Sequence, residues 1–289
     1  MHHRRALLLI VVSALSFALM AFAAKLASNS LPAGEVTFAR FLLMLAPFLA
    51  APRLVRQALT WQRLDLLVYR GLFGGTAVLL YFLAIAHVPV GVATLLNYSS
   101  PIWSVLFAAI FLGERVRPAS ILPFALAMGG MLLVTGAFSD PAAPFRLGKW
   151  ELAGFASSIL SGAAVAAIRA ARRTEGSWAI YGSFTLFGLL ITTPFAFAGF
   201  RWPTATEWFL LTLVGASSIV AQLTMTYAYR WVTNLQAGVI AQLTVVVTMG
   251  LGVLLLGDSF GPLQVLGAAL ALAGIVGVVW LQSAPRAVE

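Results

Sequence analysis

The charged side chains inside the long apolar stretches of this sequence are its strongest candidates for binding chemistry. Arg40 lies seven residues past Ala33, where one stretch begins, and Lys25 lies near the end of the first stretch. A charge inside a membrane costs about 2.5–3.5 kcal/mol or more, so such residues usually face protein or a water-filled cavity. Arg40 could face a substrate carboxylate there, or it could extend to the membrane surface or bond backbone carbonyls. Extension to the surface is the simpler account of Lys25, which is kept as an accessory candidate.

The acidic residues avoid the interiors of these stretches. All nine lie at the ends of stretches, in loops or at the C-terminus: Glu35, Asp65, Glu114, Asp140, Glu151, Glu175, Glu207, Asp258 and Glu289. A carrier that exchanges protons for cationic drugs usually needs a buried carboxylate. An intramembrane protease or prenyl transferase needs paired acids or a nucleophile with its base. The pattern therefore favours a neutral or zwitterionic substrate and argues against an enzyme.

Polar and small residues recur at helical spacing between residues 90 and 112, with a proline among them. That proline, Pro101, frees a backbone carbonyl, which a membrane tolerates where neighbours or water satisfy it. The polar groups could line a cavity that binds amino and carboxyl groups, or they could form interhelical contacts worth about 0.6 kcal/mol each. The candidate substrate-binding residues are Ser16, Arg40, Tyr81, Asn97, Tyr98, Pro101, Trp103, Ser158, Ser161, Gln222 and Gln242.

Neither a metal site nor a cofactor is expected. The chain has no cysteine and only three histidines, two of which are at the N-terminus, so no set of residues has metal-ligand spacing. A net charge of +9 can indicate nucleic-acid binding, but the basic residues lie in short loops between apolar stretches. Charge that orients a membrane protein explains them better. The expected partners are a small-molecule substrate and the lipid bilayer.

The elements that must position these residues are hydrophobic helices. Hydrophobic residues make up 61% of the 289 residues and charged residues 9%, whereas a soluble domain carries about 25% charged residues. About 20 apolar residues cross a membrane as a helix, and the stretches lack the alternation of barrel strands. The expected spans are residues 6–28, 33–51, 66–87, 90–112, 118–136, 150–170, 177–199, 207–229, 235–256 and 262–282. The first lacks a clear cleavage site and is expected to be a retained helix.

The loop charges predict the orientation of these ten helices. With the N-terminus inside, inner loops and termini carry 13 Lys and Arg residues and outer loops carry three. Basic residues concentrate on the cytoplasmic side of membrane proteins. Both termini are therefore expected in the cytoplasm, which requires an even number of spans.

An internal repeat divides the chain into residues 1–139 and 140–289. A shift of 144 residues places Leu112-Gly113-Glu114 on Leu256-Gly257-Asp258 and Pro118 on Pro262, and a shift of 145 places Ser13 and Ser16 on Ser158 and Ser161. Each copy has five spans, an odd number, so the second copy enters the membrane in the opposite orientation. Inverted repeats are typical of secondary transporters, which bind substrate near the interface of the repeats. The predicted fold is all-α, with ten transmembrane helices as two inverted five-helix repeats around a central cavity.

Three segments of the chain resemble the drug/metabolite transporter superfamily, in its ten-helix EamA branch. They are Phe38-Ala39-Arg40-Phe41, the segment from Pro101 to Leu112-Gly113-Glu114, and the segment Leu254–Ile275 with Leu256-Gly257-Asp258 and Pro262. One position departs from the pattern: Val245 stands where a second proline equivalent to Pro101 would be expected. Whether the second-copy helix bends as the first should is therefore open.

The resemblance implies a carrier of small metabolites in a bacterial inner membrane, and amino-acid exporters are similar to this chain in size and layout. This resemblance, the polar residues and the lack of acids inside the apolar stretches together lead us to expect a secondary exporter of amino acids or similar zwitterions. We expect it to work by alternating access. The alternatives are export of drugs or other metabolites and, in a different class, a membrane receptor or scaffold. Glycines in spans 118–136 and 262–282 permit close packing, in a monomer or at a homodimer face.

Overall fold

The structure is a computed structural model that describes every residue except 1, 114–117, 137–146, 229–230, 232–233 and 284–289. Its first half contains α1 (His2–Ala27), α2 (Ala33–Leu43), α3 (Ala46–Ala50), α4 (Arg53–Leu59), α5 (Leu64–His87), α6 (Val90–Asn97), α7 (Ser100–Leu112), a 3-10 turn (Pro118–Ser120) and α8 (Ile121–Val134). Its second half contains α9 (Lys149–Ala171), α10 (Ser177–Phe197), α11 (Ala205–Ala228), α12 (Asn234–Ala241), α13 (Leu243–Leu256) and α14 (Pro262–Ser283). The described residues contain no strand.

The predicted membrane fold is confirmed. Within the described ranges, nine helical segments are long and apolar enough to cross a membrane, and a shorter apolar helix covers Pro118–Val134. These ten segments coincide with the ten spans expected from hydropathy. Large apolar side chains on the outside of the bundle, such as Leu49 and Leu254 at 80% exposure, are placed to contact lipid. The predicted boundary between the repeats, at 139/140, lies outside the described residues.

The second span differs from the single helix that we expected over residues 33–51. It is interrupted after Leu43 and continues as α3, because Pro47 has no N–H to donate to the carbonyl of Leu43. The interruption also leaves the carbonyl of Met44 without its usual partner. The hydroxyl of Tyr181 donates to it at 2.8 Å, so a side chain of α10 stabilises the break.

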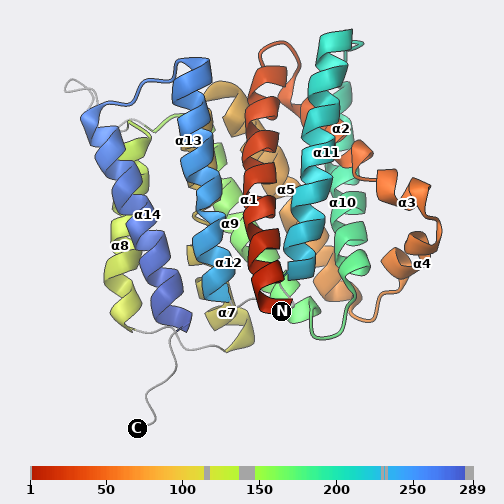
Figure 1. The fold of residues 1–289 in the computed structure, drawn as a ribbon, viewed down its shortest axis with the longest axis horizontal. Helices are drawn as coiled ribbons and strands as arrows, with labels where there is room; N and C mark the ends of the chain where they lie inside the picture. The colour runs from red at the N-terminus through yellow and green to blue at the C-terminus, as the bar shows by residue number, and fades with distance from the viewer. Residues whose placement is uncertain (1, 114–117, 137–146, 229–230, 232–233, 284–289) are drawn as a thin grey trace.

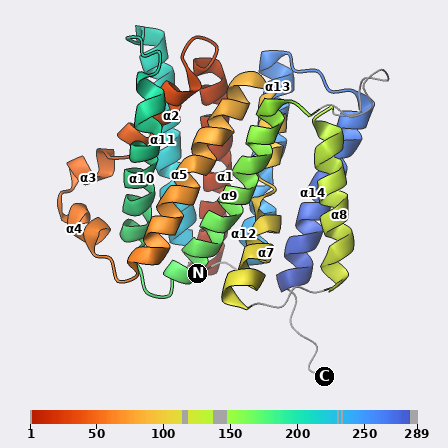
Figure 2. The same cartoon turned by 180° about the vertical axis from the view of Figure 1, so that it is seen from behind.

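Figures 1 and 2 show α8 and α14 packed side by side at one edge of the bundle, with α3 and α4 at the other edge. The glycines that we expected to permit close packing lie in this pair. A methyl group added at Gly130 would overlap the backbone nitrogen of Ala271, and one added at Gly274 would overlap that of Ala127. The shift of 144 residues places Gly130 on Gly274 and Ala127 on Ala271, so it converts each of these two contacts into the other. The pair therefore packs with the two-fold pseudosymmetry that inverted repeats predict.

Two spans are broken at equivalent positions of the two repeats. The fourth span breaks between α6 and α7 at Tyr98, and the ninth breaks between α12 and α13 at Gln242, which is 144 residues later. The breaks touch, because Nε2 of Gln242 donates to the backbone carbonyl of Tyr98 at 3.3 Å. The ninth span thus breaks without a proline at Val245, which answers the question that the sequence left open.

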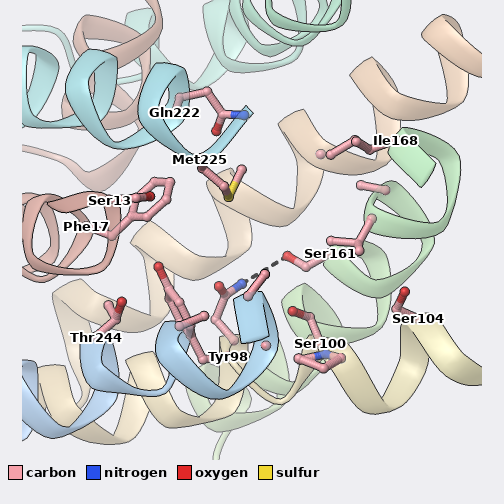
Figure 3. Close-up of a pocket in the computed structure, with 18 of the residues that line it drawn as sticks. Ser13, Phe17, Tyr98, Ser100, Ser104, Ser161, Ile168, Gln222, Met225 and Thr244 are labelled. Atoms are coloured by element: carbon pink, nitrogen blue, oxygen red, sulfur yellow. Dashed lines mark hydrogen bonds between the residues drawn. The ribbon is translucent and has the colours of Figure 1, made fainter. Parts of the chain in front are cut away.

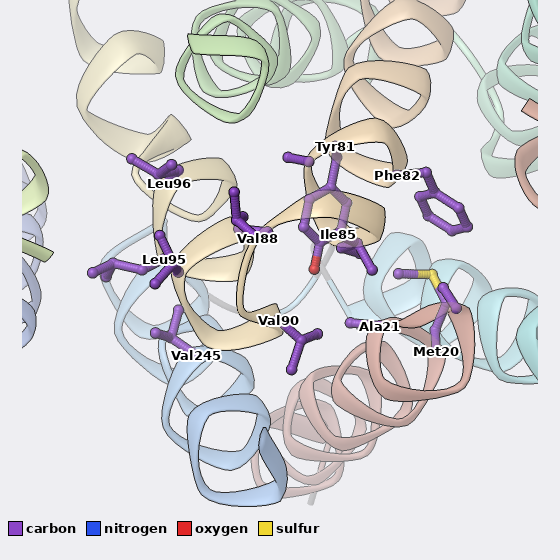
Figure 4. Close-up of a cluster of buried hydrophobic side chains, with 14 of the residues drawn as sticks. Met20, Ala21, Tyr81, Phe82, Ile85, Val88, Val90, Leu95, Leu96 and Val245 are labelled. Atoms are coloured by element: carbon purple, nitrogen blue, oxygen red, sulfur yellow. The ribbon is translucent and has the colours of Figure 1, made fainter. Parts of the chain in front are cut away.

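A large buried apolar cluster fills one end of the bundle. We call the end at which α1 begins the N-side and the other end the far side. Figure 4 shows part of the cluster, drawn from α1, α5, α6 and α13. Ile85, Val90, Leu95 and Val245 in it are fully buried. Since these residues lie near the C-terminal end of α5, in α6 and at the start of α13, the cluster closes the far side against water.

Candidate functional site

A pocket of about 750 Å³ lies between the two repeats. On the N-side it includes Ile10 of α1, Arg70 of α5 and Arg169 near the end of α9, and it extends inward to Met20 and Tyr81. Figure 3 shows side chains from α1, α7, α9 and α11 directed into it. The pocket therefore occupies the N-side half of the bundle and ends at the apolar cluster described above.

Seven of the eleven predicted substrate-binding residues line this pocket. They are Arg40, Tyr81, Asn97, Tyr98, Pro101, Ser161 and Gln222. Six helices from both repeats supply them, so the fold brings together residues that are up to 182 positions apart in the sequence. Whether they bind a substrate remains a prediction.

The other four predicted residues are not among the described residues that line the pocket. Ser158 is buried and donates to the carbonyl of Phe155 within its own helix at 2.7 Å. Trp103 packs edge-on against the rings of Phe124 and Phe155. Gln242 joins the two helix breaks, and Ser16 is half-buried beside the strip of α1 that does face the pocket. The sequence predicted helices that border the pocket, but not which face of each helix points into it.

Lys25 lies away from the pocket, near the far side. Its Nζ donates to the backbone carbonyl of Val88 at 2.9 Å. The carbonyl of Val88 follows the last turn of α5 and is within reach of α1. The side chain of Lys25 therefore bonds this carbonyl instead of extending to the membrane surface, as the sequence had led us to expect. Lys25 links two helices that border the apolar cluster.

Arg40 lies inside the bundle, with 2% of its surface exposed. Its Nε donates to Oγ of Ser218 at 2.9 Å, and its guanidinium carbon lies 4.8 Å from the ring centre of Phe41 and 5.5 Å from that of Phe184. Nη1 is buried without a hydrogen-bond partner among the described residues. Of the roles that the sequence allowed, extension to the surface is ruled out by this burial, and pocket lining fits.

Three further arginines line the pocket, and sequence reasoning assigned them to the orienting charges: Arg70, Arg169 and Arg172. The guanidinium carbon of Arg70 lies 4.0 Å from the ring centre of Phe184, and a methyl group at Gly74 would overlap that guanidinium. Nη1 of Arg172 donates to Oγ of Ser177 at 3.0 Å. Arg70 lies four residues inside the predicted third span, 66–87, and this depth was the available sign in the sequence that it does more than orient the protein.

Hydrogen bonds between helices fix the polar lining. Nδ2 of Asn97 donates to Oγ of Ser157 at 2.8 Å and to Oγ of Ser161 at 3.1 Å, which ties α6 to α9. Ser13, a lining residue of α1 that was not predicted as a site residue, donates to the carbonyl of Ala221 at 2.8 Å. The described residues contain no group of His, Asp and Glu side chains that could hold a metal ion. The arrangement can bind a polar solute in a partly apolar cavity.

Comparison with known proteins matches the chain twice to the EamA-like transporter family, over residues 4–136 and 148–280. It is 28% identical over 270 residues to a pseudopaline exporter of Pseudomonas aeruginosa, covering 93% of this chain and 94% of that protein. It is 30% identical over 195 residues to a probable terminal-alkyne amino-acid exporter of Streptantibioticus cattleyicolor, covering 66% and 64%. A riboflavin transporter of Brucella anthropi is 25% identical over 214 residues, covering 70% and 72%.

A solved crystal structure has the same fold, with a TM-score of 0.63 at 22% identity, over 96% of this chain and 98% of that one. The two family matches correspond to the two five-helix repeats that the sequence predicts. The chain therefore belongs to the EamA-like transporter family of the drug/metabolite transporter superfamily and is a multi-pass membrane transporter.

Proposed function

We propose that this protein exports amino acids or similar small zwitterionic metabolites across a bacterial inner membrane by alternating access. The observation that carries the proposal is the pocket of about 750 Å³, which both repeats line and the apolar cluster closes on the far side. A pocket that reaches one side of a bundle and is sealed from the other is what alternating access requires of one of its two states.

The chemistry of the pocket supports an amino-acid substrate. Its guanidinium groups match carboxylates in shape and charge. The amides of Asn97 and Gln222 and the phenol of Tyr98 can bond an ammonium group or a polar side chain. The ring of Phe17, which packs edge-on against Tyr98, provides apolar surface. Small-molecule sites usually combine apolar walls with a few such polar groups.

The direction of transport follows from the orientation that the loop charges predict. If both termini are cytoplasmic, the N-side is the cytoplasmic side, and the pocket in this structure loads from the cytoplasm. Two of the similar proteins are named as exporters, of pseudopaline and of terminal-alkyne amino acids, which supports outward transport. Riboflavin transporters are also similar, so export of other metabolites is the second candidate.

Alternating access is supported by one pair of equivalent positions. Ala237 of α12 lines the pocket, whereas Ala93 of α6, its counterpart 144 residues earlier, is fully buried in the apolar cluster. Only 2% of Ala237 is exposed, so this position of the repeat borders the pocket in one copy and lies within the closed cluster in the other. If the repeats exchange conformations, Ala93 comes to line a pocket on the far side.

A flux assay tests the proposal. The purified protein is reconstituted in liposomes, and exchange of labelled amino acids is measured with riboflavin and cationic drugs as competitors, with and without a pH gradient. We expect saturable exchange of at least one amino acid. We also expect it to fall at least tenfold in Arg40→Ala, which inserts normally. Binding without flux would favour a receptor, and absence of saturable amino-acid flux would refute the proposed substrate.

A further inference from the structure

The pocket contains four arginines, and no Asp or Glu is among the described residues that line it. Arg169 and Arg172 lie at the end of α9, near the mouth on the N-side. Arg40 and Arg70 lie deeper, about 10 Å and 9 Å along their helices at 1.5 Å per residue. The charge lining the path from mouth to interior is therefore positive throughout its described part.

The guanidinium groups of the two deep arginines approach the same aromatic ring. Both guanidinium carbons lie over the ring of Phe184, at 5.5 Å for Arg40 and 4.0 Å for Arg70. Only 2% of Arg40 and 4% of Arg70 is exposed. Two like charges near one ring in a low-dielectric interior repel each other, and an anion that contacts both offsets that cost. Nη1 of Arg40, buried without a partner among the described residues, leaves a donor for such an anion.

Orientation of the protein in the membrane does not explain this placement. Charges that set orientation act from the loops and helix ends, as the exposed Arg53 and Arg56 of α4 can do. They need not be buried in a pocket. The acidic group nearest to the mouth in sequence, Glu175, accepts hydrogen bonds from the backbone N–H groups of Gln62 and Arg63 at 2.9 and 2.6 Å. Its carboxylate therefore holds a loop and does not line the pocket.

We propose that the pocket selects amino-acid-type substrates with a net negative charge, that is, with at least two carboxylates for each ammonium group. This inference rests on the proposed function and narrows its substrate class. One carboxylate binds the Arg40 and Arg70 pair, where guanidinium groups can bond it in bidentate fashion. A second carboxylate is held toward Arg169 and Arg172, which also attract the anion from the cytoplasm.

A ladder of three structurally related amino acids tests this selectivity. Glutamine carries one carboxylate, glutamate two and γ-carboxyglutamate three, and each competes in liposomes against the labelled amino acid that the protein carries best. We expect the half-inhibiting concentration to fall at least tenfold from glutamine to glutamate and not to rise again for γ-carboxyglutamate. Half-inhibition by glutamine at a concentration equal to or below that of glutamate would overturn the proposal.

Variants separate a charge effect from a structural one. Arg70→Gln and Arg169→Gln should each reduce the preference for glutamate over glutamine about tenfold, while Arg169→Lys, which keeps the charge, retains most of it. Arg56→Gln, an exposed arginine outside the pocket, is the matched control and should leave the preference unchanged. Because Arg70 is buried and its variant could misfold, Arg169 at the mouth provides the independent test.

The outcomes also distinguish this inference from the proposed function. Saturable flux of amino acids with an unchanged glutamate preference in Arg169→Gln refutes the charge selectivity and leaves the amino-acid exporter standing. Absence of saturable flux for all amino acids, including the three of the ladder, refutes both. A preference that weakens with rising ionic strength supports the role of the arginines at the mouth, since salt screens partly exposed charges.

Discussion

At the scale of single residues, the position of Arg40 depends on one hydrogen bond to another helix. Oγ of Ser218 accepts from Nε of Arg40 and itself donates to the carbonyl of Val214 at 2.7 Å. A hydrogen bond to a charged group contributes about 1.5–3 kcal/mol. Ser218 therefore acts as a positioning residue that holds the guanidinium at the pocket.

We predict that Ser218→Ala raises the KM for the transported amino acid about tenfold, because Arg40 then loses its bond to α11. The adjacent Ser217 gives a matched control, since it is also buried but, among the described residues, its hydroxyl bonds only carbonyls of its own helix, those of Leu213 and Val214. Ser217→Ala should leave KM within about twofold of the unmodified protein. Initial rates in liposomes measure both. Equal effects of the two variants would show that Ser218 does not position Arg40.

Sequence reasoning predicted the residue types that line the pocket better than the directions in which their side chains point. Arg40, Asn97 and Gln222 were predicted because polar groups inside apolar stretches are costly unless they face protein or a cavity. Trp103 and Ser158 were predicted as site residues as well, but Trp103 packs against the ring of Phe124 in α8 and Ser158 bonds a carbonyl of its own helix. Arg70 and Arg169 were missed for the same reason. An arginine at the cytoplasmic end of a helix can either orient the protein or face a pocket. The two cases differ only in the direction in which the side chain points around the helix axis, and hydropathy does not report that direction.

At the scale of helices, the apolar lengths predicted the spans because lipid requires each of them to be continuous and hydrophobic. The breaks at Tyr98 and Gln242 were not predictable in the same way. Pro101 suggested the first, but nothing in the sequence of the second copy marked the other. It depends on a contact across the repeats, between the side chain of Gln242 and the carbonyl of Tyr98, which exists only once the helices have assembled.

The close contact of α8 with α14 gives a prediction at this scale. Gly130→Val should destabilise the protein by about 1–3 kcal/mol, because its side chain would overlap the backbone of α14 at Ala271 and Gly267. The next residue, Gly129, is exposed and has open space around it, so Gly129→Val is the control. Thermal unfolding in detergent compares them. Equal midpoints for the two variants would contradict the packing described for this pair.

At the scale of the whole molecule, the two repeats have the same sequence pattern but different surroundings. A shift of 144 residues converts the contacts between α8 and α14 into one another. The two broken spans, in contrast, have different surroundings. The pocket reaches the N-side, and the apolar cluster closes the far side. The proposed alternating access requires a mirrored state of similar energy, in which each repeat adopts the conformation of the other.

Site-specific cysteine labelling tests this account most directly, because the chain has no cysteine of its own. Ala237→Cys and Ala93→Cys are made separately, and a membrane-impermeant thiol reagent is applied to each face of sealed vesicles. We predict that Ala237→Cys reacts only from the cytoplasmic face and Ala93→Cys only from the outer face. We also predict that saturating substrate changes the two rates in opposite directions. Reaction of both variants from one face, or rates that substrate leaves unchanged, would contradict alternating access between the repeats.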